Sequence, residues 1–229
     1  MTSVSGIPGW PVRLTLGTMQ LRPLTRRDRK AWVAARLDNE QWLRPWEASI
    51  VPSDVVGWAE RHTSSTYRQL LHRQRAAARA RTQLPLGVFV EDQLIGQVNI
   101  GEIVHGALCS GSIGYWIDQR FAGRGIVPVA VALIADHAFR EAGLHRIEAN
   151  VRPENVASTA VVSKLGFTDE GLRRRYLAID GHWRDHISWA LLIDDHPEGV
   201  LAALLQRRPA AADALVPSRH ALSERRSLS

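Results

Sequence analysis

The order of secondary-structure signals along this chain predicts an α+β domain with a mixed central sheet. Antiparallel strand pairs come first, a strand–helix–strand unit follows, and a hairpin ends the pattern. Hydrophobic residues make up 45% of the 229 residues, which is enough for one full core. We therefore expect one domain over residues 1–196. Residues 197–229 should form a short helix and a disordered tail rich in Arg, Ala and Ser.

The first part of the chain combines two strand signals with two helix signals. Alternating apolar and polar residues predict the strands, and hydroxyl or acidic residues mark the helix starts. In order, the elements are strands Val12–Leu16 and Met19–Pro23, a helix from the N-cap Thr25 to about Asn39, an aromatic loop Trp42–Trp46, and a helix over Asp54–Arg81. Gly57 and the hydroxyl residues at 63–66 can divide the last helix into two.

The second part of the chain contains most of the predicted sheet. Glycines end both of its helices, at Gly143 and Gly166. In order, the elements are strands Leu84–Val90, Leu94–Ile103 and Ser110–Ile117, a helix over Ile126–Ala142, a strand over His145–Val151, a helix from the N-cap Asn155 to Leu165, and a hairpin of Phe167–Ile179 with Trp183–Leu192.

Charge and cysteine content exclude several classes of protein. The formal net charge is +6, but five arginines and two acidic residues lie between residues 207 and 229, so a net +3 belongs to the tail. The remaining +3 is unlike a dedicated nucleic-acid-binding domain. Cys109 is the only cysteine, so no internal disulfide can form. The start of the chain lacks a signal-peptide pattern and no apolar run is long enough to span a membrane, so we expect a cytoplasmic protein.

The turn from Arg120 to Gly125 is the strongest functional signal. It joins a predicted strand to a predicted helix, and its glycines permit a positive φ and close approach of a ligand. The first amides of a helix have no internal partner and lie at the positive end of the helix dipole, so they attract a phosphate group. The turn lacks the third glycine of a dinucleotide-binding fingerprint and the Gly-Lys-Ser/Thr of a P-loop.

Three groups of motifs together resemble the GNAT family of N-acetyltransferases. The motifs are Arg120-x-x-Gly123-x-Gly125, then Arg146–Val151 with Asn155-x-x-Ser158 and Gly166-Phe167, then Tyr176-Leu177-x-x-Asp180-Gly181-x-Trp183-Arg184-Asp185-His186. The last of these is similar to the RimJ/RimL-type ribosomal-protein-alanine acetyltransferases, and to the RimJ branch most of all. The resemblance covers about residues 19–192. It implies the GNAT fold, a mixed sheet of about seven strands that is splayed at an acetyl-CoA site and flanked by helices.

The resemblance implies acetyl-CoA as cosubstrate and no metal. Its pyrophosphate would lie on the glycine turn, and its pantetheine arm would pair like an added strand with the end of the strand before the turn. The residues expected to bind it are Trp116, Ile117, Arg120, Gly123, Arg124, Gly125, Ile126, Val127, Asn155 and Ser158. Asn155 also has a structural interpretation, because Asn is a favoured N-cap.

Catalysis requires a hydrogen-bond donor for the departing thiolate and a base for the amine. The resemblance places Ser158 as the donor, since Val162 stands where many relatives have a tyrosine and cannot donate a proton. We expect Glu102 to be the base, with Tyr115 as a further polar group near the centre. Asp118 and Glu148 stay open as alternatives, although Glu148 can equally form a structural ion pair with Arg146.

The acceptor site is the least determined part of the sequence. Residues that the resemblance and strand alternation place near the acceptor are Trp42, Trp46, Glu148, Tyr176 and Asp185. The resemblance implies an N-terminal α-amine of a protein, plausibly a ribosomal one, with a weak ribosome or RNA contact through the Arg-rich tail. A small amine acceptor and a non-catalytic binder of acetyl-CoA are the alternatives, and the protein could be a monomer or a dimer.

Overall fold

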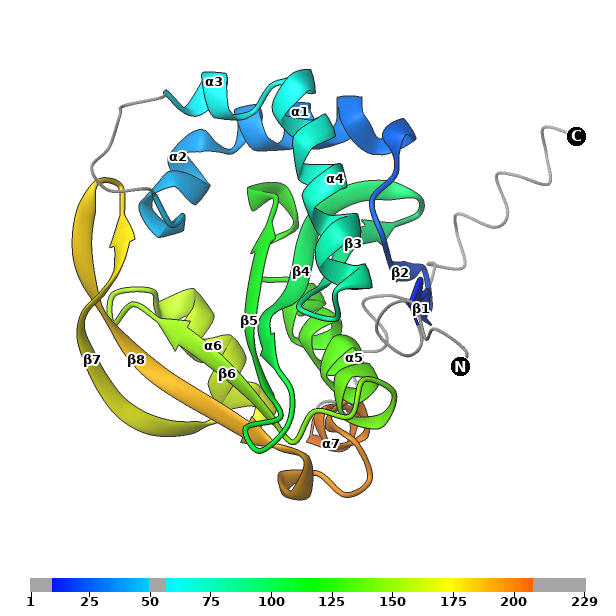
Figure 1. Ribbon diagram of the computed structural model, residues 1–229, viewed down its shortest axis with the longest axis vertical. Helices are drawn as coiled ribbons and strands as arrows, with labels where there is room; N and C mark the ends of the chain where they lie inside the picture. The colour runs from blue at the N-terminus through cyan, green and yellow to red at the C-terminus, as the bar shows by residue number, and fades with distance from the viewer. Residues whose placement is uncertain (1–9, 50–56, 208–229) are drawn as a thin grey trace, which may run out of the picture.

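The computed structural model describes residues 10–49 and 57–207 of the chain. Short 3-10 turns, labelled η, connect several of the strands and helices (Figure 1). The elements are β1 (Leu14–Leu16), β2 (Met19–Arg22), η1 (Arg26–Asp28), α1 (Arg29–Asp38), α2 (Glu40–Leu43), η2 (Arg44–Trp46), α3 (Trp58–Arg61), α4 (Ser64–Arg79), β3 (Leu84–Val90), β4 (Gln93–Val104), β5 (Ser110–Ile117), η3 (Gln119–Phe121), α5 (Ile126–Arg140), β6 (Arg146–Val151), α6 (Val156–Leu165), β7 (Thr168–Ile179), β8 (His182–Leu192), η4 (Ile193–Asp195) and α7 (Val200–Arg207).

One mixed sheet organises the described residues, in the strand order β1-β2-β3-β4-β5-β6-β8-β7. Neighbouring strands are antiparallel except β5 and β6, which run parallel and are joined by α5. The predicted α+β class is therefore confirmed. The described residues form eight strands, as many as the strand patterns of the sequence predicted one by one, where the family resemblance implied about seven.

Helices cover both faces of the sheet (Figure 1). On one face, α1 and α4 pack through a small cluster that includes Trp32 and Tyr67. On the other face, α5, α6 and α7 bury the larger core. Successive strand side chains point to opposite faces. In β5, accordingly, Ile113 and Ile117 join the larger core, whereas Trp116 packs against the smaller cluster.

Two predicted segments differ from the structure. The aromatic stretch 42–46 is not a loop but belongs to the short helical turns α2 and η2, in which Leu43 is buried. The predicted helix Asp54–Arg81 is divided at residues 62–63, where Thr63 caps α4 by accepting a hydrogen bond from the Thr66 amide at 3.2 Å. The first residues of that predicted helix and the tail from 208 lie outside the described residues.

The short C-terminal helix α7 packs against the rest of the fold. Val200 and Leu204 are buried in the larger core, and the Val200 amide donates a hydrogen bond to the Asp136 carboxylate of α5 at 2.7 Å. Within the part of the chain that the structure describes, no helix is both long and apolar enough to cross a membrane.

The parallel pair β5–β6 separates soon after it begins. Pairing involves only Ser110, Gly111 and Ser112 of β5, opposite residues 146–148 of β6. Beyond that point β5 stays paired with β4 as far as Ile117, but it diverges from β6 (Figure 1). Because backbone N–H and C=O groups on that side of residues 113–117 have no strand partner, the gap can accept an extended ligand by main-chain hydrogen bonding. The sheet is therefore splayed at its centre, as expected.

Candidate active site

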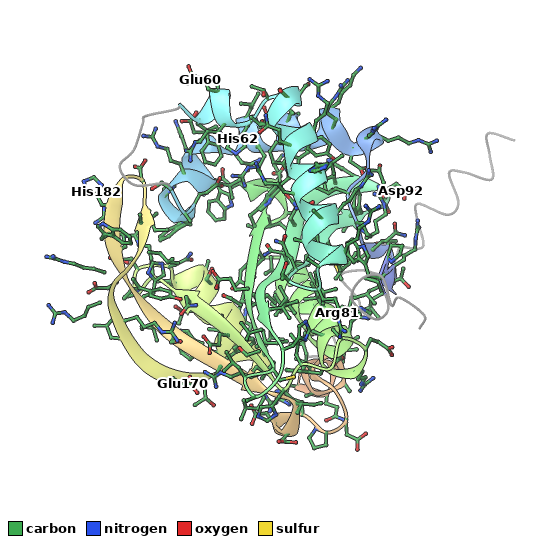
Figure 2. The ribbon with its side chains drawn as sticks, viewed as in Figure 1. Glu60, His62, Arg81, Asp92, Glu170 and His182 are labelled. Atoms are coloured by element: carbon green, nitrogen blue, oxygen red, sulfur yellow. The ribbon has the colours of Figure 1, made fainter. Side chains whose placement is uncertain are left out.

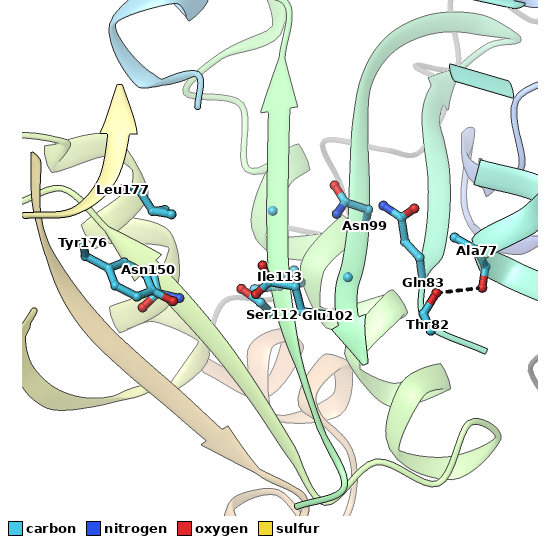
Figure 3. A pocket seen from close by; sticks show the side chains of 12 residues that line it. Ala77, Thr82, Gln83, Asn99, Glu102, Ser112, Ile113, Asn150, Tyr176 and Leu177 are labelled. Atoms are coloured by element: carbon cyan, nitrogen blue, oxygen red, sulfur yellow. Dashed lines mark hydrogen bonds between the residues drawn. The ribbon is translucent and has the colours of Figure 1, made fainter. Parts of the chain in front are cut away.

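A cavity of about 550 Å³ opens at the splayed part of the sheet. Figure 3 shows Tyr176, Leu177 and Asn150 on one side of this cavity, with Ser112, Glu102 and Asn99 on the other. Its remaining lining comes from the end of α4, the segment that follows it, and two glycines and an isoleucine of β4 and β5. These residues are Ala77, Thr82, Gln83, Gly101, Ile113 and Gly114. The cavity therefore lies on the face of the sheet that carries α1 and α4.

Glu102 lines this cavity because of a β-bulge. The pairing of β4 with β5 is irregular between Gly101 and Val104, and Glu102 lies in the bulge with φ +51°. Bulges re-aim a side chain and are common next to active sites. Glu102 is exposed, and among the residues described as lining the cavity it is the one carboxylate. The carboxylate expected to act as the base therefore lies in the cavity lining.

Tyr115 and Ser158 come together from β5 and α6. The Tyr115 hydroxyl is buried, and within the described residues no atom meets the geometry of a hydrogen bond to it. Burial raises the pKa of Tyr115 to about 12, while the neighbouring Ser158 side chain acts in the opposite direction. Tyr115 is therefore protonated at neutral pH. Side-chain alternation along β5 directs it away from the cavity-lining Ser112 and Gly114, toward the face that carries α5 and α6.

The glycine turn has the backbone that an anion site requires. Gly123 and Gly125 have φ of +75° and +78°, and Gly125 is the N-cap of α5. A Cβ added to either glycine would meet no described atom within 4 Å, so the turn is open on its outer side. The first amides of α5 therefore point into accessible space. Arg124 stacks over the Phe121 ring, 5.4 Å from its centroid.

Arg120 is engaged with Asp118 in this structure. Its guanidinium donates hydrogen bonds to both Asp118 oxygens, at 2.6 Å for the shortest, and its amide donates to the same carboxylate. Desolvation alone would raise the pKa of Asp118, but these hydrogen bonds outweigh it and hold the pKa below its usual value. Asp118 is thus a buried structural carboxylate at the start of the turn, and it does not line the cavity.

The start of α6 serves a capping role. The Asn155 side chain accepts a hydrogen bond from the Ser158 amide at 3.0 Å, which is the N-cap interpretation of Asn155. This bond also fixes the backbone of Ser158 beside Tyr115. Val162, one turn further on, is buried in the larger core. A buried apolar side chain, which cannot donate a proton, therefore stands one turn after Ser158.

The aromatic segment at residues 42–46 bridges the two diverging strands. The Trp42 indole donates a hydrogen bond to the Ile117 carbonyl at the end of β5, at 3.0 Å. Arg152, which follows β6, donates to the Pro45 carbonyl at 2.8 Å and lies over the Trp46 ring. Neither tryptophan is among the residues that line the cavity. The segment therefore spans the open end of the gap between β5 and β6.

Glu148 and Asp185, two further residues that the sequence predicted at the site, form structural contacts instead. Glu148 pairs with Arg146 at 2.9 Å and with Arg173 at 3.3 Å. Asp185 accepts a hydrogen bond from the Arg175 amide at a bulge of the β7–β8 hairpin, at 2.7 Å, and is not a lining residue of the cavity. Of the expected acceptor residues, Tyr176 alone is among those described as lining the cavity.

Sequence reasoning missed several polar lining residues, of which Asn150 is the most informative. Its Oδ1 is buried and has no hydrogen-bond partner among the described residues. The signal was present in the alternation of β6, since Asn150 shares a face with Arg146 and Glu148. No group of three or more His, Cys, Asp or Glu suited to a metal ion occurs within the described ranges.

A split parallel strand pair beside a glycine turn defines a site for an extended, phosphate-bearing ligand. Comparison with known proteins identifies the family: residues 18–168 match the acetyltransferase (GNAT) domain. A probable N-acetyltransferase of Bacillus subtilis is 33% identical over 180 residues, which are 78% of this chain and 96% of that protein. The chain therefore belongs to the GNAT acetyltransferase family, as its motifs predicted.

Two further relatives carry more specific names. The [ribosomal protein uS5]-alanine N-acetyltransferase of Escherichia coli is 33% identical over 194 residues, which are 82% of this chain and 94% of that protein. The structure of Mycobacterium smegmatis RimJ in complex with CoA-disulfide superposes with a TM-score of 0.83 at 38% identity, covering 88% of this chain and 97% of that one. The expected similarity to the RimJ branch is thereby confirmed.

Proposed function

We propose that this GNAT enzyme transfers the acetyl group of acetyl-CoA to the N-terminal α-amine of a ribosomal protein, by direct attack of the amine in a ternary complex. The observation that carries the proposal is the splayed β5–β6 pair, with a carboxylate on one side and two hydroxyls on the other. The names of the Escherichia coli and Mycobacterium smegmatis relatives support both the donor and the acceptor class. Because ribosomal proteins are made in the cytoplasm, we propose that the enzyme works there.

The residues present suit an acetyl-CoA donor. The edge of residues 113–117, where among the described residues only the Ile117 carbonyl is engaged, by Trp42, suits the amides of its pantetheine arm, and the amides of residues 124–127 suit its pyrophosphate. Gly123 and Gly125 leave room for close approach, because no described atom lies within 4 Å of a Cβ added at either position. When bound, the donor supplies an acetyl group activated as a thioester.

The residues that act on the acceptor and those that act on the leaving group lie on opposite sides of β5. Glu102 takes a proton from the acceptor nitrogen, directly or through a water molecule, since an α-amine with a pKa near 8 is already partly neutral at cellular pH. Ser158 donates a hydrogen bond to the departing sulfur, and Tyr115, which holds its own proton, supports Ser158. Asn150 Oδ1 accepts a hydrogen bond from the acceptor amine and orients it.

The other candidate bases fit less well. Asp118 and Glu148 are both held by arginines. A small polyamine or aminoglycoside acceptor would favour a closed, acidic pocket, whereas Glu102 is the one carboxylate described in the lining. These observations favour a protein N-terminus over a small polycation.

Incubation of the full chain with acetyl-CoA and peptides that begin with Ala, Ser or Met tests the proposal. Tandem mass spectrometry should locate the acetyl group on the N-terminal nitrogen. The matched control is the same peptide with a blocked N-terminus and a free lysine. If the lysine peptide or a small amine is acetylated and the free N-termini are not, the proposed acceptor class is wrong.

A further inference from the structure

A long stretch of the chain contains no acidic residue. Between Glu60 and Glu91 the sequence has six arginines and no Asp or Glu. Most of this stretch forms α4, the helix that lies on the cavity side of the sheet next to α1 (Figure 1). The local excess of positive charge is as large as the formal net charge of the whole chain, +6.

Three of the four arginines of α4, together with His72, lie on one stripe of the helix, and Arg73 lies off it. Arg68, His72, Arg75 and Arg79 are spaced by four, three and four residues, which places them on the same face, and all four are exposed. At a rise of 1.5 Å per residue the stripe is about 16 Å long. Like charges at this spacing destabilise a helix by about 0.2–0.5 kcal/mol per pair. Arg75 and Arg79 form one such pair, and a bound anion would relieve their repulsion.

A second basic group lies beside the start of this stripe. Arg26, Arg27, Arg29 and Lys30 of η1 and α1 are exposed, whereas Asp28 between them is buried and paired with Arg22 at 2.8 Å. The Tyr67 hydroxyl of α4 donates a hydrogen bond to the Thr25 carbonyl at 2.7 Å, which brings the two helix starts together.

Within residues 10–49 and 57–207, none of these arginines or the lysine takes part in an ion pair. We call the exposed basic residues of η1, α1 and α4 the basic face. Its C-terminal end adjoins the cavity, since Ala77 of α4 and the following Thr82 and Gln83 line it. Figure 2 shows Arg81 at this end of α4. Ala77 lies on the opposite side of α4 from Arg75 and Arg79, so a partner bound along the basic face would lie close to the cavity without entering it.

We propose that the basic face docks the phosphate backbone of RNA, so that the acceptor N-terminus is presented from an RNA-bearing particle rather than from a free protein. Phosphate contacts by Arg and Lys position a protein on nucleic acid without reading its sequence, and a stripe along a helix suits a regular row of phosphates. The docking itself is independent of catalysis, whereas presentation of the acceptor rests on the function proposed above.

Binding of the full chain to a fluorescent RNA duplex over a range of salt concentrations tests the docking. The informative variant is Arg68→Gln/Arg75→Gln/Arg79→Gln, and the matched control is Arg174→Gln/Arg175→Gln/Arg184→Gln on the β7–β8 hairpin, also exposed. The logarithm of the binding constant falls linearly with the logarithm of the salt concentration, and losing three phosphate contacts should make that slope shallower by about 2.7. Between 50 and 200 mM salt, the affinity of the native protein should therefore decrease about 40-fold more than the affinity of the variant. The control should behave like the native protein.

Three outcomes of the binding experiment would overturn the docking: equal losses in both variants, tighter binding to polyglutamate than to RNA, or binding to anionic vesicles alone. Presentation is tested separately, with acetyl-CoA and either a free N-terminal peptide or intact ribosomal subunits. The α4 variant should keep its peptide rate and lose at least tenfold on subunits. If no peptide is acetylated, the proposed function fails while the RNA measurement still decides the docking.

Discussion

Replacement of Tyr115 by Phe should raise stability and lower activity at the same time. The Tyr115 hydroxyl is buried without a hydrogen bond in the described structure, and a buried unsatisfied polar group costs about 1–3 kcal/mol. We take the lower end, about 1 kcal/mol, because Ser158 lies beside it. For a chain of this size the change should raise Tm by about 2–4 °C.

The same change should slow the reaction. If the Tyr115 hydroxyl bonds to Ser158 only in the donor-bound enzyme, a contact that the described structure lacks, its loss costs about 1.4 kcal/mol there and lowers kcat about tenfold, without a change in KM for acetyl-CoA. Ser158→Ala removes the donor itself and should lower kcat by about 10². Initial rates of thiol release, measured with a peptide acceptor, and thermal unfolding followed by circular dichroism provide the two readouts.

Tyr67→Phe is a matched control for which the expected change in Tm has the opposite sign. Tyr67 is also buried, but its hydroxyl donates a hydrogen bond to the Thr25 carbonyl at 2.7 Å. Its loss should lower Tm by a similar amount and leave kcat on a free peptide unchanged. If Tyr115→Phe lowers Tm, its hydroxyl has a partner in the folded protein. If kcat is unchanged, Tyr115 has no part in the chemistry.

Three further predictions follow from the turn, the bulge and a buried histidine. Gly125→Ala, at φ +78°, should lower the free energy of unfolding by about 1 kcal/mol and raise KM for acetyl-CoA at least tenfold. Gly143→Ala is the control, because Gly143 has φ +71° and is equally free of described neighbours. It should lower the free energy of unfolding by the same amount and leave KM unchanged. Glu102→Gln should lower kcat/KM about 10²-fold near neutral pH without affecting donor binding measured by calorimetry; a rate equal to that of the native enzyme would exclude Glu102 as the base. Burial and nearby Arg36 lower the pKa of His62 to about 4. Between about pH 6.5 and pH 4, His62 is therefore protonated in the unfolded chain and neutral in the native state. The free energy of unfolding should therefore fall by up to about 3 kcal/mol from about pH 6.5 to 4, and His62→Gln should flatten that part of a urea-unfolding series.

The sequence was sufficient to predict the fold and the conformation of the glycine turn because both depend on local patterns. Strand alternation and glycine stops placed β3–β8, α5 and α6, and Gly123 and Gly125 indicated the anion site directly. The prediction of a loop at residues 42–46 was wrong. The short helical turns of this segment are stabilised by distant partners, such as the Ile117 carbonyl and Arg152, which no local pattern reveals.

The acceptor side was harder to predict because it depends on which carboxylate is already paired. Glu102 is directed by a bulge whose register involves β5, and Glu148 is neutralised by Arg173 from β7. Asp185 was expected near the acceptor, but the irregular β7–β8 pairing turns it toward the Arg175 amide. Each outcome arises from side-chain pairing or strand register between two strands, which the pattern of a single strand does not reveal.

Amide hydrogen exchange with and without CoA tests most directly whether the split between β5 and β6 holds the donor. CoA should slow exchange in a peptide segment covering residues 113–127, which contains the unpaired edge of β5, the glycine turn and the first turn of α5. A segment covering β3, which is paired on both sides by β2 and β4, should be unchanged. Protection elsewhere with none in residues 113–127 would contradict the proposed donor site.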